Sequence, residues 1–214
     1  MRARLRLLLL LGPLAWPGLA RAHEPAPAPP PGSPSPGSPS PGAPPADAGL
    51  LATVMRRLAA VRASRALFTE EKTLAALRMP LRSTGRLAYR RPDQFDKITD
   101  WPRPEVLSVQ AGRLTLTTDG APRTVDLAAE PAIGALVEAI LGTLAGDLPG
   151  LRRWYHVAAT GTPASWHLTL RPRTQDLARL VREVTVTGAG ARLTRLRTVE
   201  ADGDTAVMTI TPAA

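Results

Sequence analysis

The residues that could do chemistry are few, and their spacing does not assemble a catalytic group. The histidines are His23, His156 and His167, and none has the spacing of metal ligands, so we expect no metal site. The sequence has no Cys nucleophile, no Gly-x-Ser-x-Gly elbow and no phosphate-binding glycine loop. We therefore expect neither enzymatic activity nor a cofactor.

Two acidic pairs are interpreted as structural. Glu70 and Glu71 are adjacent in a predicted strand, so their side chains face opposite sides and cannot form a carboxylate pair. Asp202 and Asp204 flank Gly203 in a predicted turn, and the residues that follow lack the rest of a calcium loop.

An arginine at the end of one predicted strand points to a functional site instead. The segment 85–91 (Gly-Arg-Leu-Ala-Tyr-Arg-Arg) predicts a strand in which Leu87, Tyr89 and Arg91 share one face. The proline that follows ends regular pairing because it has no N–H group to donate, and Phe95 comes shortly after. An arginine at the rim of an apolar face suggests that the face encloses something.

The N-terminal region has the features of an exported protein. A basic start, an apolar run and Ala-Arg-Ala at 20–22 predict a cleavable signal peptide over residues 1–22. A membrane anchor is the alternative, although glycines and prolines break the apolar run before the ~20 residues that a spanning helix needs. The proline-rich segment 23–47 predicts an extended, disordered linker, either a passive spacer or a docking motif.

The charge balance gives little support to nucleic-acid binding. The net charge of +9 falls to about +5 once Arg2, Arg4, Arg6 and Arg21 leave with the signal peptide. With no cysteine, the exported part must draw its stability from a core rather than from disulfides. We expect a soluble, monomeric exported protein that does not bind nucleic acid.

Residues 48–214 predict one α+β domain. Helical periodicity predicts an amphipathic helix over residues 48–65, with an apolar stripe at Leu51, Val54, Leu58 and Val61. About eleven short strands joined mostly by tight turns predict an antiparallel meander. A second helix is predicted over residues 131–144. Its apolar positions are Ile133, Leu136, Val137, Ile140 and Leu144.

The predicted sheet needs its apolar face covered by these two helices. Because the domain has few aromatic residues, its interior is built mainly from small or flexible side chains. Two interpretations stay open at this point: a ligand cavity under the helices, or an ordinary packed core.

Two segments resemble the LolA-type periplasmic lipoprotein carriers. Leu67-Phe68-Thr69-Glu70 is similar to that family's Ala/Ser-Phe-Thr-Gln strand, and residues 85–95 are similar to its Gly-x-Leu-x-x-x-Arg-Pro-x-x-Phe segment. The order of elements agrees over about 48–211. The resemblance implies an incomplete, unclosed antiparallel β-barrel that holds acyl chains beneath a lid of helices.

The resemblance also implies roles for single residues. Arg91 would hold the lid closed and Phe95 would lie at the cavity entrance, whereas Leu87, Tyr89 and Phe68 would line the cavity. The apolar positions of the second helix would form the lid. The alternatives are that Arg91 forms an ordinary rim salt bridge and that Phe95 is a core anchor.

Departures from the family pattern bear on cargo. Residues 109–117 lack the aromatics of the usual Ser-Asp-Gly-x-x-Leu-Trp-x-Tyr stretch, and Ala88 stands where the family often has Trp. By resemblance, the expected partners are an acylated lipoprotein or lipid cargo, an inner-membrane releasing complex or exporter, and an outer-membrane acceptor. A carrier of a different acylated lipid, glycolipid or polyketide-like molecule and a non-lipid envelope scaffold are the alternatives.

Overall fold

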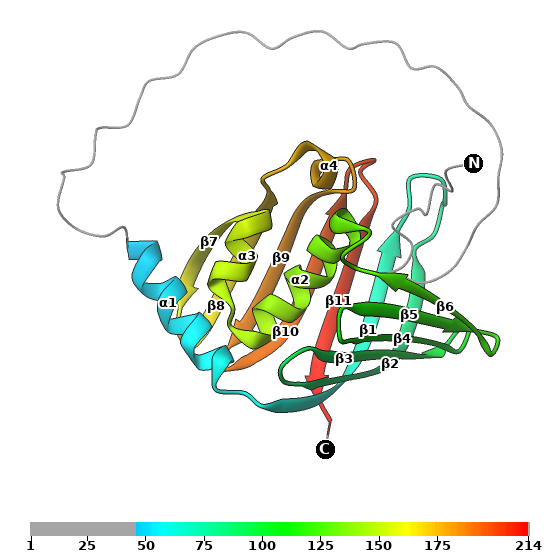
Figure 1. The fold of residues 1–214 in the computed structure, drawn as a ribbon, viewed down its shortest axis with the longest axis horizontal. Coiled ribbons are helices and arrows are strands. Elements are labelled where there is room, and N and C mark those ends of the chain that lie inside the picture. The colour runs from blue at the N-terminus through cyan, green and yellow to red at the C-terminus, as the bar shows by residue number, and fades with distance from the viewer. Residues whose placement is uncertain (1–45, 214) are drawn as a thin grey trace, which may run out of the picture.

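The computed structural model describes residues 46–213 and shows one antiparallel sheet curved around helices (Figure 1). The predicted signal peptide, and the predicted linker up to residue 45, lie outside the described residues. The sheet has eleven strands in the order β6-β5-β4-β3-β2-β1-β11-β10-β9-β8-β7. Because β6 and β7 are edges that do not pair with each other, the barrel is unclosed, and the predicted fold class is confirmed.

Consecutive strands pair within β1–β6 and within β7–β11, and β1 also pairs with β11, which joins the two halves into one sheet. The strands are β1 (Ala63–Thr73), β2 (Leu81–Arg90), β3 (Gln94–Trp101), β4 (Glu105–Gln110), β5 (Arg113–Thr118), β6 (Ala121–Asp126), β7 (Tyr155–Thr162), β8 (Ser165–Pro172), β9 (Val181–Ala189), β10 (Arg192–Glu200) and β11 (Thr205–Pro212).

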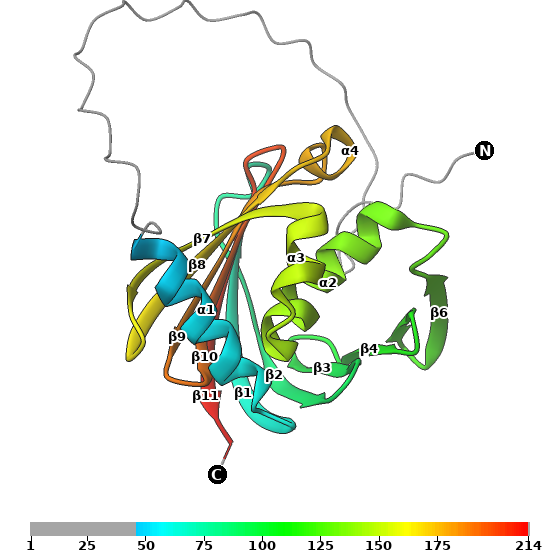
Figure 2. The same ribbon diagram turned by 60° about the vertical axis from the view of Figure 1, so that its left-hand side comes forward.

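The long helices lie on the concave side of the sheet (Figure 2). The helices are α1 (Ala46–Ala59), α2 (Pro131–Ala145), α3 (Leu148–Trp154) and α4 (Gln175–Ala178). Asp147 caps α3 by accepting a hydrogen bond from the Gly150 N–H group at 3.0 Å. The predicted stripe of α1 is buried at Leu51, Val54 and Leu58.

The first helix is shorter than the predicted span of residues 48–65. It ends at Ala59, where the Val61 N–H group donates to the Leu58 carbonyl in a final turn. Ala63 pairs with Arg90 of β2. The residues from Ala63 onward therefore form a strand, although their apolar spacing predicted a continued helix. Sheet contacts outweigh local periodicity here.

The core consists of two hydrophobic clusters with α2 between them. The larger one joins α1 to β7–β11 and includes Leu136 and Ala139 of α2. The smaller one joins β2–β5 to Val137 and Leu141 of the same helix. Leu87 and Ile140, both partly buried, pack against both clusters.

Candidate functional site

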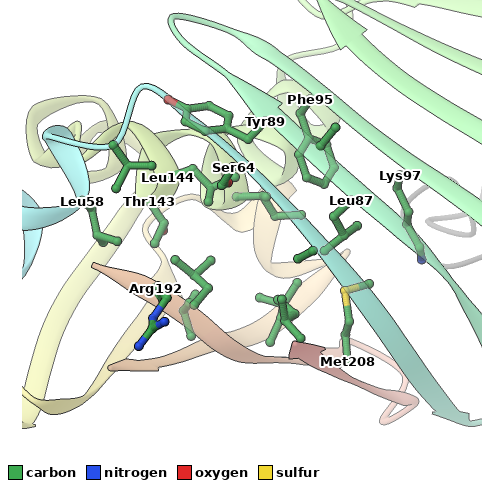
Figure 3. A pocket seen from close by; sticks show the side chains of 18 of the residues that line it. Leu58, Ser64, Leu87, Tyr89, Phe95, Lys97, Thr143, Leu144, Arg192 and Met208 are labelled. Atoms are coloured by element: carbon green, nitrogen blue, oxygen red, sulfur yellow. The ribbon is translucent and has the colours of Figure 1, made fainter. Parts of the chain in front are cut away.

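A cavity of about 340 Å³ lies between the concave face of the sheet and the C-terminal half of α2 (Figure 3). Its wall draws on β1, β2, β3, β9, β10 and β11, and on the end of α1 at Leu58. Most of the lining side chains are aliphatic. The volume falls at the lower end of the range typical of small-molecule sites. Of the two open interpretations, the structure therefore supports a cavity rather than a filled core.

Small side chains at three positions of the cavity wall leave room for the cavity. Ala66 and Ala88 line it from β1 and β2, and Ala139 lines it from α2. Exposed residues at the start of β1 and the end of β11, Ser64 and Pro212, also belong to the lining. The cavity therefore opens to solvent at that end, which we call the mouth.

The second helix forms the roof. Of its predicted apolar positions, Leu136, Ile140 and Leu144 line the cavity. Val137 is buried in the smaller cluster, and Ile133 packs against it. One face of the helix therefore lines the cavity and another packs into the smaller cluster, which agrees with the broad apolar pattern of its sequence.

Two contacts fix this roof in place. The buried Tyr155 hydroxyl of β7 donates a hydrogen bond to the Ala135 carbonyl of α2 at 2.8 Å. Burial raises the pKa of this hydroxyl, which therefore stays protonated as a donor. At the other end, Gly146 adopts φ 67°, and a Cβ there would lie 2.8 Å from the Cβ of Ala59. The roof abuts α1 at that glycine.

Arg91 lies one residue beyond β2 and contacts α1 rather than α2. Its Nη1 donates a hydrogen bond to the carbonyl oxygen of Ala59, the last residue of α1, and its backbone N–H donates to the Arg62 carbonyl at 2.9 Å. A cation at this position complements the unpaired carbonyls at a helix C-terminus. Within residues 46–213, no hydrogen bond or ion pair joins Arg91 to α2.

The other predicted site residues lie on the same concave face. Leu87, Tyr89 and Phe95 all line the cavity, and Tyr89 and Phe95 are buried (Figure 3). Phe68 is buried in the larger cluster but is not among the lining side chains. Within the described part of the chain the buried Tyr89 hydroxyl has no hydrogen-bond partner, and burial raises its pKa while Arg91 lowers it.

A buried ion pair at the inner end of the cavity was not predicted from the sequence. Lys97 Nζ lies 2.7 Å from Glu70 Oε2, and both residues line the cavity. The side chains are only 7% and 3% exposed, respectively. Strand alternation could have predicted that Glu70 faces the interior, because Glu70 follows Phe68 by two residues and therefore shares its face. Glu71 does face the opposite side, where it pairs with Arg82.

Further charges continue this polar region outside the cavity lining. Glu105 is buried beside β5 and accepts a hydrogen bond from Thr118 at 3.3 Å. Burial raises the pKa of Glu105, and the positive charge of Lys97 partly offsets that effect. Lys72 Nζ lies 3.7 Å from Glu200 Oε1, and burial raises the pKa of Glu200 despite this cation.

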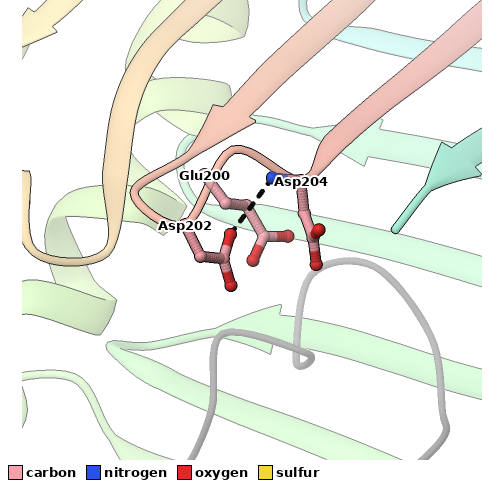
Figure 4. Close-up of side chains that lie close together, drawn as sticks. All are labelled: Glu200, Asp202 and Asp204. Atoms are coloured by element: carbon pink, nitrogen blue, oxygen red, sulfur yellow. Dashed lines mark hydrogen bonds between the residues drawn. The ribbon is translucent and has the colours of Figure 1, made fainter. Parts of the chain in front are cut away.

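Three carboxylates at the β10–β11 turn, those of Glu200, Asp202 and Asp204, lie within 4.8 Å of one another (Figure 4). Asp202 accepts a hydrogen bond from the Asp204 N–H group at 3.1 Å, and Asp204 accepts one from the Ala75 N–H group at 2.8 Å. With Glu200 beside Lys72, each acid has a structural partner. The two aspartates shape the turn, as their sequence pattern predicts.

The arrangement around the cavity is suited to binding. Among the described residues that line it, no hydroxyl or thiol has an adjacent base, and the buried charges of Lys97 and Glu70 lie paired at its inner end. Among residues 46–213, no helix is long and apolar enough to span a bilayer.

One protein family and several solved structures are similar to this chain. A family described as "Outer membrane lipoprotein carrier protein LolA-like" matches residues 43–214. Among solved structures, a LolA superfamily protein from Nitrosomonas europaea is 10% identical, with 75% of this chain and 92% of that chain covered and a TM-score of 0.40. The search of curated proteins returned no match.

Two further solved structures are similar at the same level. The Pseudomonas aeruginosa MucA/MucB complex matches at 12% identity and a TM-score of 0.43, with 76% of this chain and 56% of that chain covered. A DUF1329 family protein from Desulfovibrio piger matches at 11% identity and a TM-score of 0.43, with 75% and 88% covered. Because its family match extends over the whole described domain, the chain belongs to the LolA-like family of outer membrane lipoprotein carrier proteins.

Proposed function

We propose that this domain is a non-enzymatic periplasmic carrier that shields the acyl chains of lipoproteins during their transfer from the inner to the outer membrane. The observation that carries the proposal is the apolar cavity beneath α2, in a chain of the LolA-like family. Burial of an acyl chain contributes about 0.8 kcal/mol per CH₂ group, so an apolar cavity supplies affinity without any catalytic group.

Arg91 acts in this proposal as a latch on the first helix. Leu58 at the end of α1 lines the cavity, and Arg91 bonds to the carbonyl of the next residue, Ala59. Release of that bond frees part of the cavity wall. Phe95 lines the cavity from the start of β3 and takes the role of entrance residue.

The remaining parts of the proposal concern export and partners. A cleaved signal peptide over residues 1–22 delivers the protein to the periplasm, and residues 23–47 serve as its linker. Cargo comes from an inner-membrane releasing complex and passes to an outer-membrane acceptor. Mass spectrometry of the mature protein purified from the periplasm checks the cleavage, because it reports the N-terminal residue directly.

Uptake of a defined lipid tests the central claim. The delipidated protein is mixed with a triacylated lipopeptide or with the same peptide without acyl chains, and complexes are counted by native mass spectrometry. We expect a complex only with the acylated form. Failure to bind the acylated form overturns the proposal, and recovery of a small lipid instead of lipoprotein from periplasmic material supports the alternative cargo.

A substitution at the mouth locates the binding site. Ser64 is exposed, lines the cavity and pairs across strands with Tyr89, so Ser64→Trp places a large ring in the opening. Thr69→Trp is the matched control, because Thr69 is exposed on the opposite face of the same strand. We expect Ser64→Trp to lower lipopeptide uptake at least about tenfold, the equivalent of ~1.4 kcal/mol of binding free energy, with the control unchanged. Equal uptake by both variants places binding elsewhere.

A further inference from the structure

The inner end of the cavity contains a carboxylate with one oxygen unused. Lys97 Nζ lies 2.7 Å from Glu70 Oε2, and the Ser83 hydroxyl donates to the same oxygen at 3.4 Å. Glu70 Oε1 is buried and has no hydrogen-bond partner among the described residues. Glu70 as a whole is 2% exposed and belongs to the cavity lining.

Such an arrangement is unfavourable for an empty apolar cavity. A buried ion pair loses hydration, and replacement by apolar residues of similar volume is often neutral or stabilising. A buried acceptor without a donor adds a further desolvation cost. Both partners of Glu70 approach the same oxygen, so the other oxygen is left for a group that residues 46–213 do not supply.

The kind of group follows from the chemistry of that oxygen. An ionised carboxylate only accepts hydrogen bonds, so its partner must donate one. An anionic head group is disfavoured, because Glu105 is a second buried acid near the same lysine. The apolar walls, with Leu87 and Met208 drawn beside Lys97 in Figure 3, require the rest of the ligand to be a hydrocarbon chain.

We propose that the cavity selects lipids with a neutral hydrogen-bond donor, a hydroxyl or an amide N–H, which binds Glu70 Oε1 while the apolar chain extends toward the mouth. This inference rests on the proposed carrier function and names the class of lipid that the cavity prefers. Fatty acids and simple esters lack such a donor at neutral pH and bind less tightly.

A series of lipids with one chain length tests the selection. Lauryl alcohol, lauramide, methyl laurate and laurate compete with the fluorescent probe N-phenyl-1-naphthylamine for the full-length protein, delipidated beforehand. We expect the alcohol and the amide to displace the probe at concentrations about tenfold lower than those needed for the ester and the acid. A tenfold difference corresponds to the contribution of about one charge-assisted hydrogen bond. Methyl laurate is neutral and has no hydrogen-bond donor, so weak binding of this ester would show the need for a donor rather than repulsion of a negative charge.

Two variants assign the preference to Glu70. Glu70→Gln is expected to abolish it, whereas Glu71→Gln, on the opposite face of β1, is expected to keep it. If Glu70→Gln fails to fold because Lys97 loses its counter-charge, the double variant Glu70→Leu with Lys97→Met removes both charges and is expected to bind all four lipids alike.

The outcomes separate this inference from the proposed function. Equal displacement by all four lipids, or a preference that survives in Glu70→Gln or in the double variant, overturns the selection while the carrier function stands. If neither the probe nor any lipid binds, the carrier function fails and the selection fails with it.

Discussion

Substitution of Arg91 by leucine is expected to loosen the end of α1 and to speed exchange of cavity contents. The variant loses the hydrogen bond from Nη1 to the Ala59 carbonyl but keeps the backbone bond from residue 91 to Arg62. Since Leu58 lines the cavity directly before Ala59, movement at this helix end opens the cavity wall.

The size of the effect follows from two contributions. A typical hydrogen bond contributes a net stability of about 1 kcal/mol, and a cation at a helix C-terminus adds about 0.3–1 kcal/mol. The sum of about 1–2 kcal/mol corresponds to a factor of roughly 5–30 in the local opening equilibrium. We expect this change at the end of α1, because the lost hydrogen bond is made to its last residue, Ala59.

Hydrogen exchange measures this opening residue by residue. The Val61 amide, which donates to the Leu58 carbonyl at 2.9 Å, reports on the helix end, and the buried Val186 in β9 serves as reference. We expect the Val61 amide to exchange about 5–30-fold faster in Arg91→Leu and the Val186 amide to be unchanged. A bound fluorescent lipid should leave faster by a similar factor.

The control is Arg90→Leu, because Arg90 is exposed on the opposite face of β2. It removes the same charge and leaves the Ala59 bond intact. Equal exchange rates in Arg91→Leu and wild type refute the latch, and so does a lipid release rate that stays constant while Val61 exchange accelerates.

Two further predictions concern stability. In urea unfolding, Gly85→Ala should destabilise the domain by about 1–3 kcal/mol, because a Cβ there would lie 2.8 Å from Phe68 Cε1 and against the Ile98 carbonyl. The control Gly49→Ala should instead stabilise α1, because nothing lies within 4 Å of a Cβ at that position. Burial raises the folded-state pKa of Glu105 above its unfolded value near ~4.3, so its contribution to stability is present below that value and is lost as pH rises through the folded pKa. Glu105→Gln removes this loss, so the urea midpoint of the variant should rise relative to that of wild type as pH increases above about 4. A difference in midpoint that stays constant with pH, or an alanine at residue 85 without effect, contradicts the respective reasoning.

Sequence patterns predicted the sheet well because its turns are short and local. The eleven strands form the predicted meander, and the hairpin over Glu105–Gln110 and Arg113–Thr118 turns within two residues. The helix over Pro131–Ala145 also matches its predicted span within one residue. Each of these elements is determined by alternation, helical period or turn residues within its own segment.

Features that depend on distant contacts could not be predicted in the same way. The end of α1 is decided by pairing of Ala63 with Arg90, which no local pattern contains. The partner of Arg91 is likewise a carbonyl 32 residues away. The Glu70–Lys97 pair joins residues of β1 and β3, with β2 between them, and only the register of β2 brings them together.

The two helices differ in how firmly they are held, and this difference indicates where cargo passes. The roof helix α2 packs into both hydrophobic clusters and is tied to β7 by the buried Tyr155 hydrogen bond. The end of α1 contributes Leu58 to one cluster and is tied to β2 by the exposed Arg91. To lift α2 would break contacts with both clusters and a buried hydrogen bond. To move the end of α1 breaks contacts with the larger cluster and with Gly146, and two exposed hydrogen bonds, from Arg91 to Ala59 and from Arg57 to Pro163. Because the mouth lies at this same end, at Ser64 and Pro212, exchange is expected to proceed there while α2 stays in place.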